Sequence, residues 1–240
     1  MSLALLALLA APAATSAAPG RIVWTFDQTA RIGGIKAEAE GSPRLVDSPL
    51  GKAVAFDGVD DALFVPWHPL AGARTFTFEA VFRPDGGKFE QRWFHLASDE
   101  APGAATPTNT RILFEVRVVD GGKWYLDAFV RGPGYNQPLM FPEKLYATGC
   151  WFHVAQTYDG RTYRSYVNGV LQGEKEIAFQ PQGAGRASVG VRINRVDWFK
   201  GAVREARFTF RALAPSEFEI DPRLKNQPAR CLGKEAHSPG

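Results

Sequence analysis

Alternation of apolar and polar positions runs along most of the chain and predicts β-strands. In the segment RTFTFEAVFRP, residues 74–84, apolar and aromatic residues fill every second position, which is typical of a half-buried antiparallel strand. Shorter segments of similar character lie at 21–26, 53–56, 62–65, 92–98, 112–119, 123–130, 187–193 and 198–213. Clusters of Gly, Pro, Asn and Asp separate them. Many short strands with turn signals between them predict a single all-β sandwich or barrel.

The stretch WFHVAQTYDGRTYRSYVNGVL, residues 151–171, predicts two successive hairpins with turns at Asp159-Gly160 and Asn168-Gly169. Side chains of the first strand should alternate between its two faces. Trp151, His153, Ala155 and Thr157 then share one face, and Phe152, Val154, Gln156 and Tyr158 share the other. We expect this double hairpin in the middle of the sandwich.

Three regions are predicted to lack regular strands. Residues 28–50 are rich in Gly, Pro and charge, with one weak strand at 44–46, and residues 99–110 form a polar loop. Residues 131–144 contain three prolines and two glycines, which favours a long connection. No linker divides the chain, so we expect one domain over residues 21–218 and a solvated tail over 219–240, attached only if Cys231 is bonded.

The N-terminal residues 1–17 are predicted to be a secretory signal peptide. They carry no charge and contain an apolar run from Leu3 to Ala11, with Thr15 and Ala17 before the expected cleavage point. This run is too short for a membrane anchor, and no later segment of the chain is long and apolar enough to span a bilayer. The expected location is therefore periplasmic or extracellular.

Composition agrees with a folded, exported β-protein and excludes one class of partner. Hydrophobic residues make up 45% of the chain, which is enough for a substantial core. The net charge is only +3, and no run of Lys and Arg appears, so we expect no binding to nucleic acid. The oligomeric state is not encoded in any pattern that we recognise.

Cys150 and Cys231 are the only cysteines. An even number in an exported chain favours a disulfide, with two unpaired thiols as the alternative. A bond would close a long loop and stabilise the fold by roughly 4 kcal/mol.

Five segments in a fixed order carry a family resemblance. They read GKAVAFDGVDDALFVP, FTFEAVFRP, WFHVAQTYDG, YRSYVNG and FKGAVREARFTFRALAPSEF. Their order and spacing, from Arg21 to Phe218, resemble the laminin-G-like, concanavalin A-like lectin domains of secreted proteins. The resemblance implies an antiparallel jelly-roll sandwich and a carbohydrate or an extracellular protein as partner. Fold alone does not assign a function.

The resemblance also implies a structural calcium ion. The oxygen ligands that calcium prefers are available at Asp27 and in the sequence FDGVDD, at Asp57, Asp60 and Asp61. Where the family usually has an Asp-Glu pair in its last strand, this chain has Arg204-Glu205. One hypothesis is that Arg204 faces inward and pairs with an aspartate, replacing the ion. The alternative is that FDGVDD forms acidic turns without metal.

Sugar recognition needs aromatic faces and a few polar groups in a groove. The residues chosen as ligand-binding candidates are Trp124, Arg131, Tyr135, Asn136 and Gln137. Trp124 and Tyr125 are adjacent on one strand, so only one of them can face a groove. His95 and His153 have no nucleophile at a recognisable spacing, and we interpret both as hydrogen-bonded structural residues.

An enzyme is not favoured by the sequence. Glycoside hydrolysis needs two carboxylates facing each other, and Glu115, Asp120, Asp127 and Glu143 appear scattered. No serine-hydrolase, zinc-protease or phosphate-binding motif is found. A non-catalytic carbohydrate-binding module is therefore our prediction. The alternatives are a polysaccharide-active hydrolase or lyase on the same fold, and an adhesive or structural envelope protein.

Overall fold

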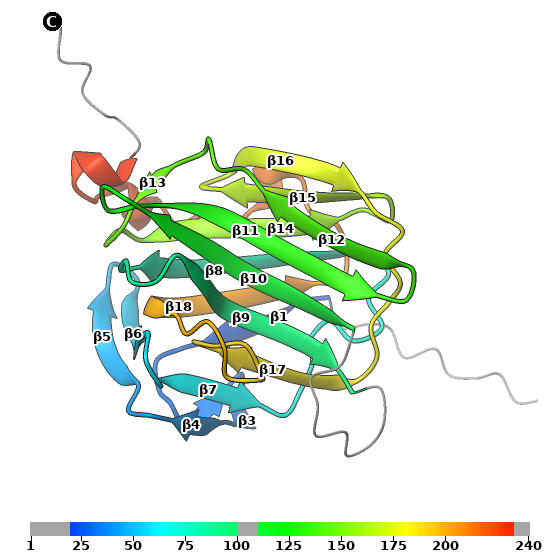
Figure 1. Cartoon of the computed structure of the whole chain (residues 1–240), viewed down its shortest axis with the longest axis horizontal. Helices are drawn as coiled ribbons and strands as arrows, with labels where there is room; N and C mark the ends of the chain where they lie inside the picture. The colour runs from blue at the N-terminus through cyan, green and yellow to red at the C-terminus, as the bar shows by residue number, and fades with distance from the viewer. Residues whose placement is uncertain (1–19, 100–109, 233–240) are drawn as a thin grey trace, which may run out of the picture.

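The computed structural model describes residues 20–99 and 110–232, and these residues form two antiparallel sheets packed face to face (Figure 1). The predicted signal peptide and most of the loop expected at 99–110 lie outside the described residues. All strand pairs between the named elements are antiparallel. This confirms the predicted all-β, concanavalin A-like jelly-roll sandwich.

The first sheet has eight strands. In spatial order they are β16 (Val170–Glu176), β15 (Thr162–Val167), β14 (Phe152–Tyr158), β8 (Phe76–Pro84), β18 (Lys200–Thr209), β6 (Gly51–Asp57) and β5 (Arg44–Ser48), with β1 (Ile22–Thr25) pairing with β18. The predicted double hairpin is thus β14–β15–β16. It occupies one end of this sheet rather than its middle.

The second sheet also has eight strands. In order they are β12 (Tyr135–Met140), β11 (Lys123–Gly132), β10 (Arg111–Val119), β9 (Glu90–Ser98), β17 (Gly185–Val189), β7 (Ala62–Val65) and β4 (Glu38–Glu40), with β13 (Tyr146–Ala147) pairing with β11. The short strands β2 (Arg31–Ile32) and β3 (Ile35–Lys36) pair separately. Three 3₁₀ helices follow the last strand: η1 (Pro215–Glu217), η2 (Pro222–Lys225) and η3 (Ala229–Leu232).

Aromatic rings fill the space between the sheets. Phe78 of the first sheet stacks on Phe114 of the second with ring centroids 3.8 Å apart, and Phe82 stacks on Trp93 at 4.4 Å. All four are fully buried. Stacked and edge-to-face pairs of this kind stabilise beyond the area they bury. The inward positions are the apolar ones of the alternating pattern, so the core follows directly from the sequence.

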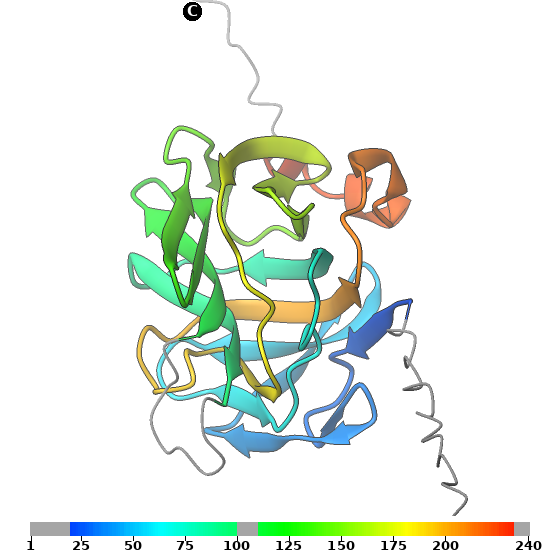
Figure 2. The same ribbon diagram turned by 90° about the vertical axis from the view of Figure 1, so that its right-hand side faces the viewer.

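The C-terminal segment, residues 213–231, covers the outer face of the first sheet. Figure 2 shows it in orange and red on the side of the molecule opposite the green strands of the second sheet. Leu213 and Phe218 pack against Ala155 and Tyr166, and Leu224 packs against Trp151. Both faces of β14 are therefore buried. The second sheet's outer face lies on the opposite side of the molecule from this segment.

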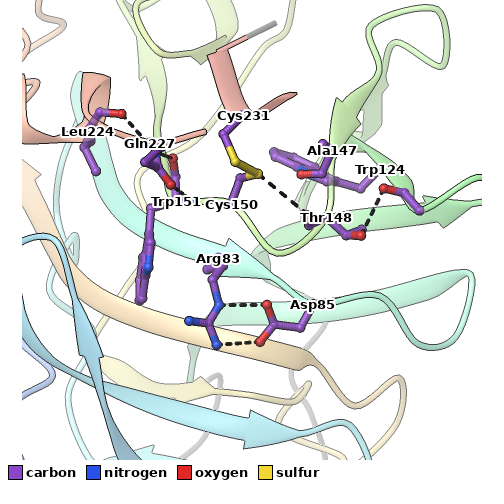
Figure 3. Close-up of a disulfide and its surroundings, with 11 residues drawn as sticks. Arg83, Asp85, Trp124, Ala147, Thr148, Cys150, Trp151, Leu224, Gln227 and Cys231 are labelled. Carbon is purple, nitrogen blue, oxygen red and sulfur yellow. Dashed lines mark hydrogen bonds and ion pairs between the residues drawn. A yellow bond between two sulfur atoms is a disulfide. The ribbon is translucent and has the colours of Figure 1, made fainter. Parts of the chain in front are cut away.

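A disulfide fixes the end of this segment (Figure 3). Cys150 and Cys231 are bonded, with Cα atoms 5.4 Å apart, which confirms the predicted pair. Close by, the Gln227 amide donates to the Trp151 carbonyl and accepts from the Trp151 N–H, both at 2.7 Å. The predicted tail is therefore attached as far as Cys231 instead of being solvated throughout.

Two sequence expectations about loops were wrong. Residues 131–144 are largely strand: β11 extends to Gly132, a tight turn follows, and β12 begins at Tyr135. Pro138 is tolerated because β12 is the edge of its sheet, where a missing N–H leaves no ladder bond unmade. Residues 28–50 likewise contain four short strands, β2 to β5, instead of one.

Candidate functional site

The outer face of the second sheet carries an unusual concentration of charge. The charged side chains come from strands β9, β10 and β11 and from the loop 190–199 that follows β17. We call this surface the charged face, and its charged residues are Glu90, Arg92, Arg111, Glu115, Arg117, Asp127, Arg131, Arg192 and Asp197. The alternation of side chains explains it, because Ile112, Phe114 and Val116 of β10 point into the core.

Two arginines hold the acids of this face. Arg92 pairs with Glu90, Glu115 and Asp197, and its Nε lies 2.6 Å from Glu115 Oε1. Arg117 contacts Asp127 Oδ2 through Nε and Nη2, both at 2.8 Å, and Glu90 at 3.0 Å. Glu115 and Asp127 are almost completely buried. The result is a connected ion-pair network on a sheet face instead of isolated surface pairs.

Glu115 and Asp127 lie directly opposite each other on β10 and β11. The expectation that these acids are scattered was therefore wrong. Burial, followed by repulsion from Asp127, raises the pKa of Glu115 to about 7. Burial raises the pKa of Asp127 to about 6, against the lowering effect of Arg117. Like charges directly opposite on a sheet repel, and Arg92 and Arg117 offset this repulsion. Raised pKa values of neighbouring buried carboxyl groups are a feature of candidate functional sites.

His95 fixes the loop that borders the charged face. Its Nδ1 accepts the N–H of Ile193 at 3.0 Å, and the Asp197 carbonyl accepts the N–H of Arg92 at 2.8 Å. Burial, with the nearby Arg192, holds the pKa of His95 well below its usual value, so the ring stays neutral and can accept. Arg195 and Asp197 have positive φ, of 61° and 58°. Backbone strain of this kind collects at functional sites.

Aromatic rings and a pocket complete this surface. The guanidinium of Arg111 lies over the Phe129 ring at 5.1 Å, that of Arg117 over Phe89 at 5.5 Å, and that of Arg195 over Phe64 at 4.9 Å. A pocket of about 600 Å³ opens where β7 and β17 meet the loop, lined by Phe64, Arg186, Ile193 and Arg195 among others. Charged groups, aromatic rings and a pocket are therefore adjacent on this surface.

The predicted ligand-binding residues do not all reach this surface. Arg131 and the exposed Asn136 are opposite each other on β11 and β12, on the charged face. The prediction for Trp124 was wrong, because its side chain is fully buried between the sheets. Its neighbour Tyr125 lies on the outer side of the sheet, opposite Arg117, and is also buried. Tyr135 is buried against Phe179, and its hydroxyl donates to the Gln180 carbonyl.

Gln137 shares the side of Val130, its partner on β11, which points into the core. His153 bonds Glu79 at 2.9 Å beneath the C-terminal segment, as a structural histidine should.

The residues proposed for calcium do not fit the ion well. Asp57, Asp60 and Asp61 offer oxygens within 4.8 Å of one another, but Asp27 is not among them. Asp57 Oδ1 accepts the N–H groups of the three residues Val59 to Asp61, and both carboxylate oxygens of Asp61 accept backbone N–H groups. Three of the four oxygens on these two residues are thus surrounded by donors, where a calcium site would present carbonyl oxygens.

The hypothesis that the Arg204 side chain faces inward and pairs with an aspartate was wrong. A β-bulge places Arg204 as an extra residue between Val203 and Glu205, so the simple alternation that pointed it inward breaks there. Its Nε donates to the Leu50 carbonyl at 3.0 Å. Within the described residues, no carboxylate forms an ion pair with it.

Calcium is expected to leave the stability of the protein unchanged. We expect the melting temperature in 5 mM calcium to match that in EDTA within about 1 °C, because ligand binding to the native state alone would raise it. Differential scanning fluorimetry measures this. A rise with calcium that disappears in Asp60→Asn would show that the turn binds the ion after all.

Comparison with known proteins assigns the family. Residues 57–218, more than half of the chain, match the family described as Concanavalin A-like lectin/glucanases superfamily. The chain belongs to this superfamily. The match runs from the end of β6 past η1 and includes every strand of the charged face. No curated protein matches the chain.

Solved structures with a similar fold include binding domains of toxins and modules of extracellular enzymes. The binding domain of Paraclostridial Mosquitocidal Protein 1 is 14% identical with a TM-score of 0.61, over 82% of this chain and 50% of that one. Domain 4 of AbnA, a GH43 extracellular arabinanase from Geobacillus stearothermophilus, solved with arabinotriose, is 18% identical with a TM-score of 0.60, over 82% and 94%.

NanB sialidase from Streptococcus pneumoniae is 17% identical with a TM-score of 0.53, over 78% of this chain and 28% of that one. The chain thus spans half of the toxin domain, about a quarter of the sialidase and nearly all of the arabinanase domain. At these identities the likeness shows the fold alone. In the part of the chain that the structure describes, no helix is long and apolar enough to cross a membrane.

The charged face was missed from sequence although one signal for it was available. The residues Asp120, Gly121 and Gly122 separate the two strands predicted at 112–119 and 123–130. Pairing these strands outward from that three-residue turn places Glu115 opposite Asp127. Arg92 carries no such signal. Its place beside Glu115 depends on a β-bulge at Trp93, which has no partner on β10.

Proposed function

We propose that this protein is an exported, non-catalytic carbohydrate-binding module whose ligand lies across the charged face. The observation that carries this proposal is the pair of like-charged opposite neighbours, Glu115 with Asp127 and Arg111 with Arg131. Like charges directly opposite each other repel, and such local choices are expected where function requires them.

The position of the face supports the same proposal. The C-terminal segment occupies the outer face of the first sheet, whereas strands β9 to β12 face the viewer in Figure 1 with no described strand or helix in front of them. The half-buried Phe129 supplies ring surface for the C–H face of a sugar, and Asn136 and Arg131 supply hydrogen-bond donors.

The relatives and the covalent structure agree with this role. Domain 4 of AbnA was solved with arabinotriose, and other structural relatives are toxin binding domains. The disulfide fits a periplasmic or extracellular protein.

The proposal is tested by a glycan array with the purified protein, followed by calorimetry on the best ligand. Phe129→Ala should weaken binding about tenfold, because stacking of this kind contributes on the order of 1 kcal/mol. Val170→Ala is the matched control, since Val170 is exposed on the first sheet. Absence of binding to every glycan, or equal losses in both variants, would reject the proposal.

A second candidate function is favoured by the Glu115–Asp127 pair. Two neighbouring carboxyl groups with pKa values raised to about 7 and about 6 resemble the acid and base of a glycoside hydrolase. A polysaccharide-degrading activity would release reducing ends from a polysaccharide panel and would be lost in Glu115→Gln. Binding without any release would leave the non-catalytic module as the function.

A further inference from the structure

The pocket beside Phe64 lies on the other side of the loop 190–199 from β10 and β11. This loop lies over β9 and β17: the Ile193 N–H donates to His95 Nδ1 at 3.0 Å, and the Ser188 hydroxyl donates to the Val191 carbonyl at 2.6 Å. Beyond the loop the second sheet continues through β7 to its edge strand β4 (Figure 1). The pocket, of about 600 Å³, opens over this end of the sheet.

The edge of the sheet forms one wall of the pocket. Ala37 points into the core, so its neighbours Lys36 and Glu38 lie on the outer side, and both line the pocket. Glu38 on β4 is directly opposite Phe64 on β7. The pocket therefore has two exposed, oppositely charged side chains along one side of an aromatic ring.

Apolar groups form the floor and the opposite wall. Phe64 is half-buried, and Pro66 follows it at the end of β7. Ile193 and Arg195 of the loop line the facing side, and the Arg195 guanidinium lies over the Phe64 ring at 4.9 Å. The pocket is thus a slot with an apolar base between an edge strand and a loop.

The two arginines that line the pocket are each paired with a carboxylate. Arg195 Nε lies 2.7 Å from Glu40 Oε2, and Arg186 Nη2 lies 2.8 Å from Asp99 Oδ1. Their positive charges are therefore compensated by the protein itself. Neither arginine makes this pocket a site for an anion.

Lys36 and Glu38 are the polar groups that remain for a ligand. Within the residues that the structure describes, neither side chain forms an ion pair or a hydrogen bond. Lys36 offers N–H donors, and Glu38 offers acceptor oxygens. Because their charges cancel, the pocket favours neither cations nor anions. A ligand with several hydroxyl groups, each of which donates and accepts, satisfies both side chains.

Size and surface narrow the class of ligand further. Pockets for small ligands are usually a few hundred Å³ and mostly apolar with a few polar groups, as here. A fully apolar molecule would take Lys36 and Glu38 out of water without giving them partners. An acidic sugar would be repelled by Glu38. A neutral sugar places its C–H face on apolar surface and its hydroxyls against the two charged groups.

We propose that this pocket is a second carbohydrate site, which binds a short neutral oligosaccharide through Phe64, Lys36 and Glu38. It goes beyond the proposed function, because the loop 190–199 separates it from the strands that carry Phe129 and Asn136. Neither site requires the other to be occupied.

Nuclear magnetic resonance of the ¹⁵N-labelled protein tests this site directly. Maltotriose, xylotriose and arabinotriose are the neutral probes, and trigalacturonate is the acidic one. We expect at least one neutral trisaccharide to shift the backbone amide signals of residues 36–38, 64–65 and 193–195. Trigalacturonate should leave these signals in place.

A double variant separates recognition from folding. Lys36→Ala with Glu38→Ala should weaken binding of the neutral trisaccharide about tenfold, because hydrogen bonds to charged groups are lost. Its melting temperature should match that of the wild type, since both side chains are exposed. Lys175→Ala with Glu176→Ala, on the exposed edge strand β16 of the first sheet, is the matched control and should change neither quantity.

The second site and the charged face fail in different ways. Amide shifts confined to β10, β11 and β12, unchanged in the Lys36→Ala, Glu38→Ala variant, would overturn the second site and leave the proposed function in place. Shifts of the pocket by trigalacturonate as large as those by a neutral probe would overturn the neutral ligand class. Equal losses in the two double variants, or no shift of the pocket by any neutral probe, would also overturn it. The glycan array and Phe129→Ala test the charged face independently.

Discussion

Replacing Arg92 with methionine is expected to lower the free energy of unfolding by about 3–5 kcal/mol at pH 8. Arg92 is the shared partner of Glu90, Glu115 and Asp197, and Glu115 is almost fully buried. Removing one partner of a buried ion pair leaves the other charge without compensation. Chemical denaturation of the variant and the wild-type protein measures the difference.

The loss of unfolding free energy in Arg92→Met should increase as the pH rises. Glu115 has its pKa raised in the folded protein to about 7, so its contribution to stability is fully present below its unfolded pKa and is lost as pH rises through 7. Arg92 lowers this pKa, and without it the folded value rises further. The Arg92→Met deficit is therefore expected to be small near pH 5 and to reach its full size above pH 8.

Arg161→Met supplies the control for this experiment. Arg161 pairs with Glu176 on the surface, with most of its side chain exposed, and such pairs contribute about 0–1 kcal/mol. An Arg92→Met loss as small as that of the control, or one equal at pH 5 and pH 8, would contradict the view that the charged face is a buried network.

Removing the disulfide is expected to cost about 4 kcal/mol, because Cys150 and Cys231 are 81 residues apart and the bond restricts the unfolded chain. For a domain of this size the corresponding fall in melting temperature is about 8–16 °C. The double variant Cys150→Ala, Cys231→Ala avoids leaving a buried thiol. In this double variant the C-terminal segment should become accessible to limited proteolysis, because the disulfide no longer holds it on the first sheet.

Glycan binding by the double cysteine variant shows whether the loss of the disulfide affects the charged face or only the stability of the fold. The charged face lies on the second sheet, so the folded double variant should keep wild-type affinity. A melting temperature within about 3 °C of wild type would contradict the stabilising role assigned to the disulfide. Loss of binding with the fold intact would show that the C-terminal segment supports the charged face.

Local pattern was sufficient for the hairpins, and the count of two cysteines in a chain expected to be exported was sufficient for the disulfide. Asp159-Gly160 and Asn168-Gly169 are turns between β14, β15 and β16, because these residue pairs adopt the required backbone angles with little strain. The alternation of β14 was also predicted correctly. Composition misled where a proline sat on the edge strand β12 and where Gly, Pro and charged residues surround the short strands β2 to β5.

Side-chain direction was predictable only where the strand stayed regular. At Trp124 and Tyr125 the sequence showed that one of the two faces outward, but the choice required the second sheet to be placed against the first. At Trp93 and Arg204 a bulge adds one residue and reverses the alternation beyond it. Neither bulge has a signal in the local sequence.

The sequence by itself therefore determined the all-β class, the family and the Cys150–Cys231 pair, since these depend on periodicity, turn residues and motif order. The charged face was decided by the tertiary structure. It needs the register that opposes Glu115 to Asp127 and Arg111 to Arg131, the bulge that turns Arg92 toward them, and the loop that adds Arg192 and Asp197. These contacts join residues distant in sequence, and only the pairing of strands brings them together.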